Sequence, residues 1–377
     1  MNISRRQLLS RFAVTTAAVP LMLRFGIDSC EASAATAVDW SMGFPQGAVL
    51  LNRNENPLGP SPRAIKFATE GIPRSYRYAD PDLIRSMLAQ HHEIDKEWIL
   101  VGTGSGELLS LAPLVFAREG NVVSSLEAYR ALTNYTSKLG IPVKWVKMLA
   151  NNNYAYDVEG LLAAVDEDTR LLFVVTPNNP TNTVLSYEDL KRIADALPTH
   201  VLLVVDEAYI QYQPDGPTGI DLLKAGNYRN VLVTRTFSKA YGLAGLRIGY
   251  GVGHPDIMNK IAQFGCGPTS TNMAGFGAAV GALEDQAHVA SSRAFAQETR
   301  AYYEQECQKF GLPFIGGDSI FMLIELGDRT KEISVELQKQ KIYIRTGEEW
   351  DLPSYLRVSY GHEEENQAFF AALKQLL

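Results

Sequence analysis

Residues 234–247 read Thr-Arg-Thr-Phe-Ser-Lys-Ala-Tyr-Gly-Leu-Ala-Gly-Leu-Arg, and this stretch is the most informative part of the chain. It places Lys239 beside the hydroxyls of Thr236 and Ser238, with Arg247 eight residues further on. An amine can form an imine with an aldehyde, while hydroxyls and a guanidinium can bind a phosphate dianion. Pyridoxal phosphate is the cofactor that needs both functions. The alternative is a surface lysine on a Gly-rich turn.

A second segment, residues 201–209, reads Val-Leu-Leu-Val-Val-Asp-Glu-Ala-Tyr. Five consecutive apolar residues predict a strand that is buried on both faces, as in a parallel sheet. Asp206 then falls at the strand end, where ligands bind in open α/β sheets. Its carboxylate could keep a pyridine nitrogen protonated, and Tyr209 could reach the ring hydroxyl. The alternative is that Asp206 caps the following helix.

A third segment, residues 171–182, reads Leu-Leu-Phe-Val-Val-Thr-Pro-Asn-Asn-Pro-Thr-Asn. It predicts another apolar strand, followed by a turn rich in Pro and Asn. The amide of Asn179 could donate a hydrogen bond to a phenolic oxygen. By itself this segment indicates only a turn, but the three segments in this order and spacing favour a cofactor site.

A Gly-rich turn at residues 102–106 follows a short apolar run, 98–101, and precedes a helix-like run, 107–116. Such a turn at a helix N-terminus presents unpaired backbone N–H groups to an anion, and the helix dipole adds to the attraction. A Gly-rich turn alone is weak evidence. Because it precedes the other motifs, we assign Gly104, Ser105 and Gly106 to the phosphate.

Taken together, these segments resemble the fold-type-I pyridoxal-phosphate enzymes of the class I/II aminotransferases, in their histidinol-phosphate aminotransferase-like branch. The resemblance runs from Leu51 to the C-terminus. Its further signatures are Leu-Asn-Arg-Asn-Glu-Asn-Pro-Leu-Gly-Pro-Ser-Pro at 51–62, Tyr-Arg-Tyr-Ala-Asp-Pro at 76–81 and Tyr-Leu-Arg-Val-Ser-Tyr-Gly at 355–361.

The resemblance implies a role for each matching residue. Lys239 matches the lysine that forms the internal aldimine with the cofactor and moves the α-proton. Arg357 matches the arginine that binds the substrate α-carboxylate, for which a planar fork is suited. Asn56 and Arg345 match further substrate-binding positions. The cofactor contacts implied are Asp206 to the pyridine nitrogen, Asn179 and Tyr209 to the ring oxygen, Tyr129 stacked on the ring, Thr236, Ser238 and Arg247 to the phosphate, and Tyr78 to the phosphate of the other subunit of a homodimer.

Three positions depart from the pattern of this branch. Asn182 stands where a glycine is usual, and the pair Ile320-Phe321 replaces an Asn-Phe pair that lies close to substrate in relatives. Arg345 precedes Arg357 by twelve residues, one residue short of the usual spacing. These departures leave the cofactor residues intact but argue against assigning histidinol phosphate as the substrate.

The N-terminus predicts export. Residues 4–9, Ser-Arg-Arg-Gln-Leu-Leu, form a twin-arginine motif, and a modestly apolar stretch at 12–25 precedes small-residue cleavage patterns at 32–37. We therefore expect a signal peptide over 1–37, export of the folded, cofactor-loaded protein by the twin-arginine machinery, and a periplasmic or secreted enzyme without stable membrane insertion. The alternatives are an ordinary helix of the domain and a lipoprotein site at Cys30.

Short apolar runs near 99–101, 121–124, 143–147, 171–176, 201–206, 231–235 and 247–252 alternate with helix-length segments. This predicts an α/β fold with a mostly parallel seven-stranded sheet. We place a large domain at 71–265. A smaller α+β domain should combine 38–70 with 266–377 and include a long helical stretch over 272–310.

Composition excludes some classes of function. A net charge of −7 without a basic run gives no support for nucleic-acid binding. The six histidines show no metal-ligand spacing, so no metal site is expected. We expect free thiols at Cys266 and Cys307, because the protein folds in a reducing compartment before export.

The leading functional hypothesis is an aminotransferase that acts on an amino acid or a related α-carboxylate amine and a keto acid. Another reaction of the same cofactor, such as decarboxylation, racemisation, elimination or amino-acid oxidation, is the second hypothesis. A non-catalytic binding protein is the third. The residues Lys239, Asp206 and Arg247 speak against the third.

Overall fold

The computed structural model of the protein describes residues 41–226, 228–267 and 269–377. The predicted signal peptide, 1–37, lies outside these residues. Residues Gly47–Leu377 form one compact unit, which holds the helices and strands of the described chain.

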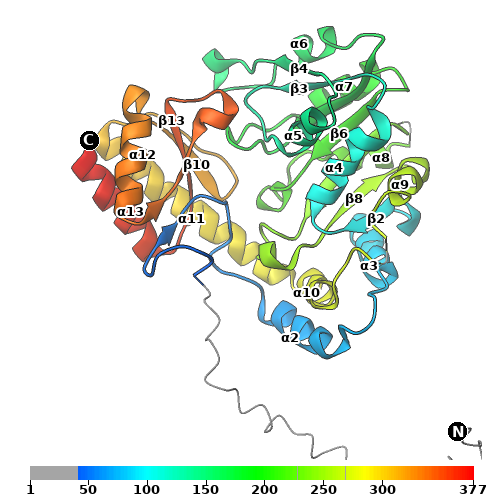
Figure 1. The fold of residues 1–377 in the computed structure, drawn as a ribbon, viewed down its shortest axis with the longest axis horizontal. Coiled ribbons are helices and arrows are strands. Elements are labelled where there is room, and N and C mark those ends of the chain that lie inside the picture. Colours follow the sequence, from blue (N-terminus) through cyan, green and yellow to red (C-terminus); the bar gives the residue numbers. More distant parts are fainter. Residues whose placement is uncertain (1–40, 227, 268) are drawn as a thin grey trace, which may run out of the picture. The chain divides into compact units, whose positions relative to one another are not determined.

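A seven-stranded sheet, drawn on the right in Figure 1, is the largest sheet of this unit. Its strand order is β2-β8-β7-β6-β5-β3-β4, and only β8 runs antiparallel to its neighbours. The prediction of a mostly parallel seven-stranded sheet is confirmed, with each strand at its predicted place. The strands are β2 (Ile99–Gly102), β3 (Asn121–Ser125), β4 (Val143–Val146), β5 (Thr169–Val175), β6 (Leu202–Asp206), β7 (Val231–Thr236) and β8 (Gly249–Gly253).

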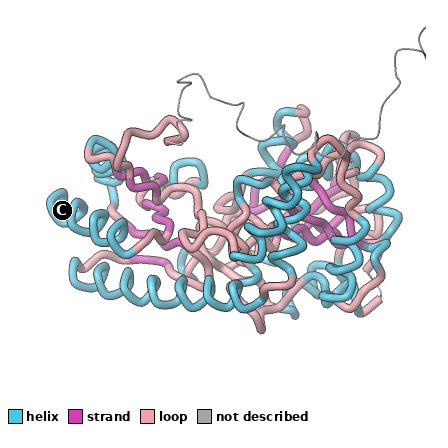
Figure 2. The backbone as a smooth tube through the Cα atoms, turned by 90° about the horizontal axis from the view of Figure 1, so that it is seen from below, coloured by secondary structure: helices cyan, strands magenta, loops and turns pink. Residues whose placement is uncertain are grey.

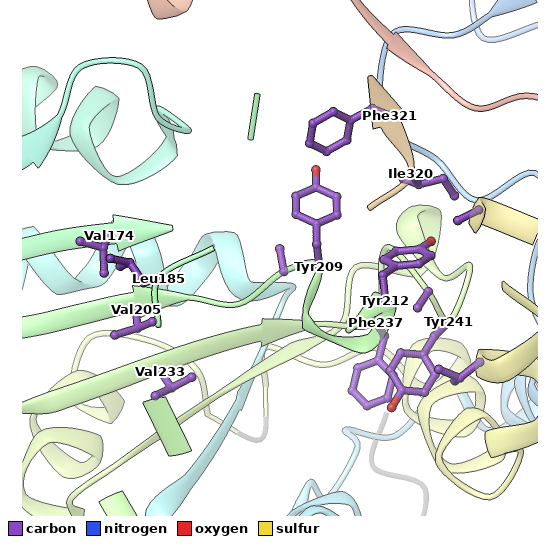
Figure 3. Packing of buried hydrophobic residues seen from close by; sticks show 14 of the residues in the cluster. Val174, Leu185, Val205, Tyr209, Tyr212, Val233, Phe237, Tyr241, Ile320 and Phe321 are labelled. Carbon is purple, nitrogen blue, oxygen red and sulfur yellow. The ribbon is translucent and has the colours of Figure 1, made fainter. Parts of the chain in front are cut away.

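The central strands are apolar throughout because helices cover both faces of the sheet. Phe173 and Val204 pack into one buried cluster. Their neighbours Val174 and Val205, which are labelled in Figure 3, point to the opposite face and pack into another. The first cluster includes side chains from α4 (Ser105–Phe116), α5 (Ala131–Lys138) and α9 (Pro255–Ala262). The second includes side chains from α3 (Asp82–His92), α6 (Val158–Ala163), α7 (Tyr187–Ala196) and α8 (Gly219–Lys224).

A smaller antiparallel sheet, in the order β12-β13-β10-β9, is built from the C-terminal part of the chain. It is accompanied by a short parallel pair, β1 with β11, and by the long helix α11, which is prominent in Figure 2. The exact domain boundaries that we place at residues 70 and 265 stay a prediction. The elements are β1 (Val49–Leu50), β9 (Phe314–Ile315), β10 (Phe321–Glu325), β11 (Ile342–Tyr343), β12 (Arg345–Thr346), β13 (Tyr355–Ser359), α12 (Thr330–Lys339) and α13 (Glu363–Leu376).

The helical stretch predicted over 272–310 is two helices rather than one. Helix α10 (Met273–Leu283) ends before Asp285, whose side chain accepts a hydrogen bond from the backbone N–H of His288 and so caps α11 (Gln286–Phe310). The small residues of α10 serve close packing against α2 (Pro62–Gly71). A Cβ added at Gly277 would lie 2.2 Å from the carbonyl oxygen of Phe67, so the two backbones nearly touch.

Short 3-10 turns complete the described chain. None of the helices in the described residues combines the length and the apolar character that a membrane span requires. Cys266 and Cys307 are both buried and unbridged. The 3-10 turns are η2 (Ile72–Arg74), η3 (Lys96–Trp98), η4 (Ala150–Asn152), η5 (Ile210–Tyr212), η6 (Ala244–Leu246), η7 (Gly327–Arg329) and η8 (Gly347–Trp350).

Candidate active site

The three segments that decide the fold also meet at one edge of the large sheet. Because β5, β6 and β7 are parallel neighbours, their carboxyl ends lie side by side. Asn179 follows β5, Asp206 is the last residue of β6, and Thr236 is the last residue of β7. The topology thus gathers the predicted cofactor residues where open α/β sheets bind ligands.

Asp206 is a buried carboxyl group, 1% exposed, that accepts a hydrogen bond from Thr234 Oγ1 at 2.8 Å. Burial raises its pKa to about 7, and the nearby charge of Glu207 adds to this effect. A buried carboxylate needs a cationic partner to stay ionised. A protonated pyridine nitrogen is such a partner, so the environment of Asp206 fits the nitrogen of pyridoxal phosphate.

Lys239 is partly buried, and its Nζ donates hydrogen bonds to the backbone oxygens of Arg53 (3.1 Å) and Asn54 (3.0 Å). Nζ also lies 5.7 Å from the centroid of the Tyr209 ring. Burial, together with the positive charge of Arg357, lowers the pKa of Lys239 to about 8. The lowered pKa increases the share of neutral amine, which is the form that attacks an aldehyde or accepts a proton.

The predicted phosphate residues come together where α4 begins. Arg247 has φ 51°, and its guanidinium approaches the Gly-rich turn so closely that a Cβ at Gly104 would lie 2.7 Å from Nη2. Gly249, which pairs with Thr236 across the sheet, packs against the backbone N–H of Ser105. A guanidinium and a helix N-terminus therefore converge, as a phosphate dianion requires.

We call Thr236, Ser238, Arg247 and the start of α4 the phosphate cup, and two of its hydroxyls are hydrogen-bonded to each other. Thr236 Oγ1 donates to Ser238 Oγ at 2.9 Å and accepts from the Ser238 backbone N–H at 3.1 Å. Gly106 lies in the first turn of α4, next to Ser105. Glu107 fixes the turn from behind, because its carboxylate accepts hydrogen bonds from the backbone N–H groups of Thr103 and Cys266. This positioning by Glu107 was not predicted.

Asn54 is the main site residue that the sequence reasoning missed. It is 1% exposed, and its Nδ2 donates to the hydroxyl of Tyr209 at 2.9 Å, while its carbonyl oxygen accepts from Lys239. Its φ of 53° lies in the left-handed region, which asparagine tolerates better than most residues. The hydroxyl of Ser359 accepts a hydrogen bond from the backbone N–H of Asn54 and donates one to Asn54 Oδ1. The repeated asparagines at 52, 54 and 56 are the sequence feature that could have indicated a role for Asn54 in the site.

Arg357 is a buried cation, 2% exposed, whose Nη1 donates to Asn179 Oδ1 at 2.8 Å and whose Nη2 donates to the Asn52 carbonyl at 2.6 Å. Its Nε has no partner within the described residues, and none of their carboxylates lies within 4 Å of the guanidinium. Burial lowers its pKa to about 10. The rings of Phe321 and Trp350 lie 5.7 and 5.0 Å from the guanidinium.

Two other predicted residues lie around this centre. Tyr129 is 37% exposed, and its pKa is raised by the desolvation of its buried part and next by the negative charge of Asp206. Its predicted stacking on the cofactor ring stays a prediction. Asn56 bonds to protein partners: its Nδ2 donates to the Ala240 carbonyl and to Ser292 Oγ. Its role in substrate binding stays a prediction.

The remaining two predicted residues lie at the edges. Arg345 pairs with Glu349 and lies 5.4 Å from the Trp350 ring, so its guanidinium already has a carboxylate partner. Tyr78 is 80% exposed and lines a separate surface hollow with Tyr76 and other residues. Its predicted contact with a cofactor of another subunit stays a prediction.

The departures from the branch pattern find a local explanation. Asn182 has φ 60°, a conformation that favours glycine, and it is held there by hydrogen bonds from Ser319 Oγ to its Oδ1 and from its Nδ2 to the Phe321 carbonyl. Ile320 is fully buried and packs in the core, whereas the Phe321 ring meets Tyr209 edge-on at 5.3 Å (Figure 3).

Comparison with known proteins decides the family. The sequence model described as aminotransferase class I and II matches residues 46–373. The chain belongs to this family. It is 35% identical to histidinol-phosphate aminotransferase 2 of Pseudomonas fluorescens over 341 residues, which cover 88% of this chain and 90% of that protein. It is 34% identical to histidinol-phosphate aminotransferase 2 of Nitrosospira multiformis, over 88% of this chain and 85% of that one.

Solved structures agree with this family. Histidinol-phosphate aminotransferase from Sinorhizobium meliloti, in complex with pyridoxal-5'-phosphate, superposes with a TM-score of 0.81 at 27% identity, covering 87% of this chain and 91% of that one. The fold-type-I prediction is thereby confirmed, and so is the prediction of a pyridoxal-phosphate-dependent aminotransferase. The role of each individual residue stays a prediction.

Proposed function

We propose that this aminotransferase takes its amino group from a substrate with a single anionic group beside the amine, normally the α-carboxylate of an amino acid, and passes it to a keto acid. The observation that carries the proposal is Arg357, a buried guanidinium without a carboxylate partner among the described residues. A buried charge is costly unless a counter-ion compensates it. A planar carboxylate at Arg357 would supply that counter-ion.

The arrangement also supports proton transfer by Lys239. When bound, pyridoxal phosphate acts as an electron sink that stabilises the charge left on the substrate Cα after its proton is removed. The Lys239 amine, with its pKa lowered to about 8, can accept that proton. Asp206, Tyr209 and the residues of the phosphate cup would hold the cofactor in place during this step.

Histidinol phosphate is a second candidate substrate, because the relatives carry its name. Its single phosphate is carried by a CH2–O group on the amine-bearing carbon, on the side where an amino acid has its α-carboxylate. That anion could therefore also compensate Arg357. Steady-state assays with histidinol phosphate and a panel of amino acids, each with 2-oxoglutarate, would test both. A value of kcat/KM for histidinol phosphate well above the panel would select it, and the opposite order would select an amino acid.

For assembly, we propose a homodimer in which Tyr78 serves the site of the partner subunit. Tyr76 and Tyr78 are 78% and 80% exposed, which is unusual for large aromatic side chains. They line a hollow with the helix residues Met273 and Phe276. A second copy covering this hollow would bury them. Sedimentation of the active protein tests the idea, because an active monomer would contradict it.

For localisation, we propose periplasmic or secreted placement by the twin-arginine route, on the basis of Arg5 and Arg6 and the apolar stretch that follows them. This route exports folded proteins, which suits an enzyme that binds its cofactor before export. Replacing both arginines with lysine should keep the cofactor-loaded protein in the cytoplasm. Export of the double variant at the normal level would contradict the proposal.

A further inference from the structure

The side-chain amide of Asn54 is held in one orientation by Ser359, the last residue of β13. The Ser359 hydroxyl accepts a hydrogen bond from the Asn54 backbone N–H at 2.8 Å and donates its own proton to Asn54 Oδ1 at 2.9 Å. With the amide turned over, the nitrogen could not accept that proton, and the buried hydroxyl would lose this partner. The amide therefore has a defined oxygen side and a defined nitrogen side.

The nitrogen side of this amide meets Tyr209, which is expected to contact the ring oxygen of the cofactor. Asn54 Nδ2 lies 2.9 Å from the Tyr209 hydroxyl, and both side chains are buried. An amide nitrogen only donates, so the Tyr209 oxygen accepts in this bond. The single proton of Tyr209 then has to be donated in another direction. A hydroxyl that accepts one hydrogen bond also becomes a stronger donor.

The small sheet holds Tyr209 at two points. Phe321 on β10 is directly opposite Ser359 on β13 in the antiparallel pair. The Phe321 ring meets the Tyr209 ring edge-on, with 5.3 Å between the ring centroids (Figure 3). Phe321 thus packs against the ring, while Ser359 acts through Asn54 on the hydroxyl. Lys239 Nζ lies 5.7 Å from the centroid of the same ring, so the hydroxyl is held beside the amine that would bind the cofactor.

We propose that Asn54 is a positioning residue that directs the proton of Tyr209 toward the ring oxygen of the bound cofactor. Because Asn54 already donates to the Tyr209 oxygen, the tyrosine would act as a donor to the cofactor. A donor at the ring oxygen stabilises its negatively charged form and weakens its hold on a shared proton. Ser359 acts one step further back, by fixing the amide. This inference rests on the contact expected between Tyr209 and the ring oxygen.

Replacing Asn54 with aspartate reverses the polarity of this bond with little change of shape. A carboxylate only accepts hydrogen bonds, so the Tyr209 proton would turn to residue 54 and be lost to the cofactor. Aspartate also tolerates the φ of 53° that Asn54 adopts, a conformation that disfavours alanine. Ser359→Ala removes the group that fixes the amide and should produce a smaller change in the same direction.

Two measurements report on the ring oxygen without turnover. The visible band of the holoenzyme should change at a higher pH in Asn54→Asp, because a ring oxygen with one donor fewer holds a shared proton more strongly. The second measurement compares the dissociation constants of pyridoxamine phosphate and of an analogue that lacks the ring hydroxyl. In Asn54→Asp the preference for pyridoxamine phosphate should fall by about tenfold to a hundredfold, the range for a hydrogen bond to a charged group.

The double variant Asn54→Asp with Tyr209→Phe separates the proton from the added charge. The charge of aspartate acts in both backgrounds, whereas a proton can turn only where the Tyr209 hydroxyl is present. The loss of preference should therefore be much smaller in the Tyr209→Phe background. An equal loss in both backgrounds, or no loss in Asn54→Asp, would overturn the inference.

The single variant Tyr209→Phe tests the contact on which the inference rests. It should lower the preference for pyridoxamine phosphate by itself. An unchanged preference would show that the expected contact with the ring oxygen is wrong, and the inference would fall with it. None of these variants touches Arg357 or requires an amino donor, so their results are separate from the proposed function.

Discussion

Replacing Arg357 with alanine should selectively weaken substrates that carry an α-carboxylate. The guanidinium is 2% exposed and donates to Asn179 and Asn52, so its geometry is fixed before a ligand arrives. Removing one partner of a buried, hydrogen-bonded charge pair typically costs about 2–5 kcal/mol. Since each 1.4 kcal/mol is a factor of ten, kcat/KM should fall by about 30-fold to several thousand-fold.

The assay compares each amino acid with its decarboxylated amine, which lacks the group that Arg357 would bind. The amino acid should lose most of its advantage over the amine in Arg357→Ala, while the residual rate with the amine should change much less. Arg357→Lys should recover part of the loss, because lysine keeps the charge but not the planar fork. Thermal unfolding of both variants controls for the lost bonds to Asn179 and Asn52. An equal loss for acid and amine would refute the assignment.

Three further predictions concern the cofactor site. Borohydride reduction of the holoenzyme should fix the cofactor to Lys239, and mass spectrometry that finds the adduct on another lysine would contradict this. In the cofactor-free protein, the rate at which Lys239 captures the cofactor should rise with pH through about 8, where the amine loses its proton. The pKa of Asp206 is raised to about 7, so the cofactor-free protein should lose stability as pH rises from about 4 through 7. Asp206→Asn should abolish this slope in denaturant titrations, and an unchanged slope would count against it. Gly104→Ala should weaken cofactor binding in equilibrium dialysis, because the residue has φ 75° and its new Cβ would lie 2.7 Å from Arg247 Nη2. Equal affinity would contradict the idea that cofactor binding depends on the close approach of Arg247 to residue 104.

Much of the fold is readable from the sequence because the central strands are buried on both faces and therefore appear as continuous apolar runs. The same logic predicts that Asp206 and Asn179 lie together, since both follow parallel strands. Contacts between residues that are far apart in the sequence are harder to predict. Asn54 forms hydrogen bonds with Tyr209 and Ser359, which lie 155 and 305 residues away in sequence, so the local run of asparagines does not show which residues they contact.

Local competition explains two other differences. The stretch over 272–310 is rich in helix formers, but Asp285 caps a new helix and divides the stretch into α10 and α11. Arg345 matches a substrate-binding arginine by its approximate spacing, but only the structure shows that Glu349 occupies its guanidinium. Sequence spacing shows that a charged residue is present, whereas its partner depends on the path of the backbone.

The most direct test of the central claim is a half-reaction. The holoenzyme is mixed with an excess of an amino acid and no keto acid, and the visible band of the bound cofactor is followed together with the keto acid released. An aminotransferase should lose the band while releasing one keto acid per site, and addition of a keto acid should restore it. Release of products over many turnovers with the band intact, or with uptake of dioxygen, would contradict amino transfer as the reaction of this enzyme.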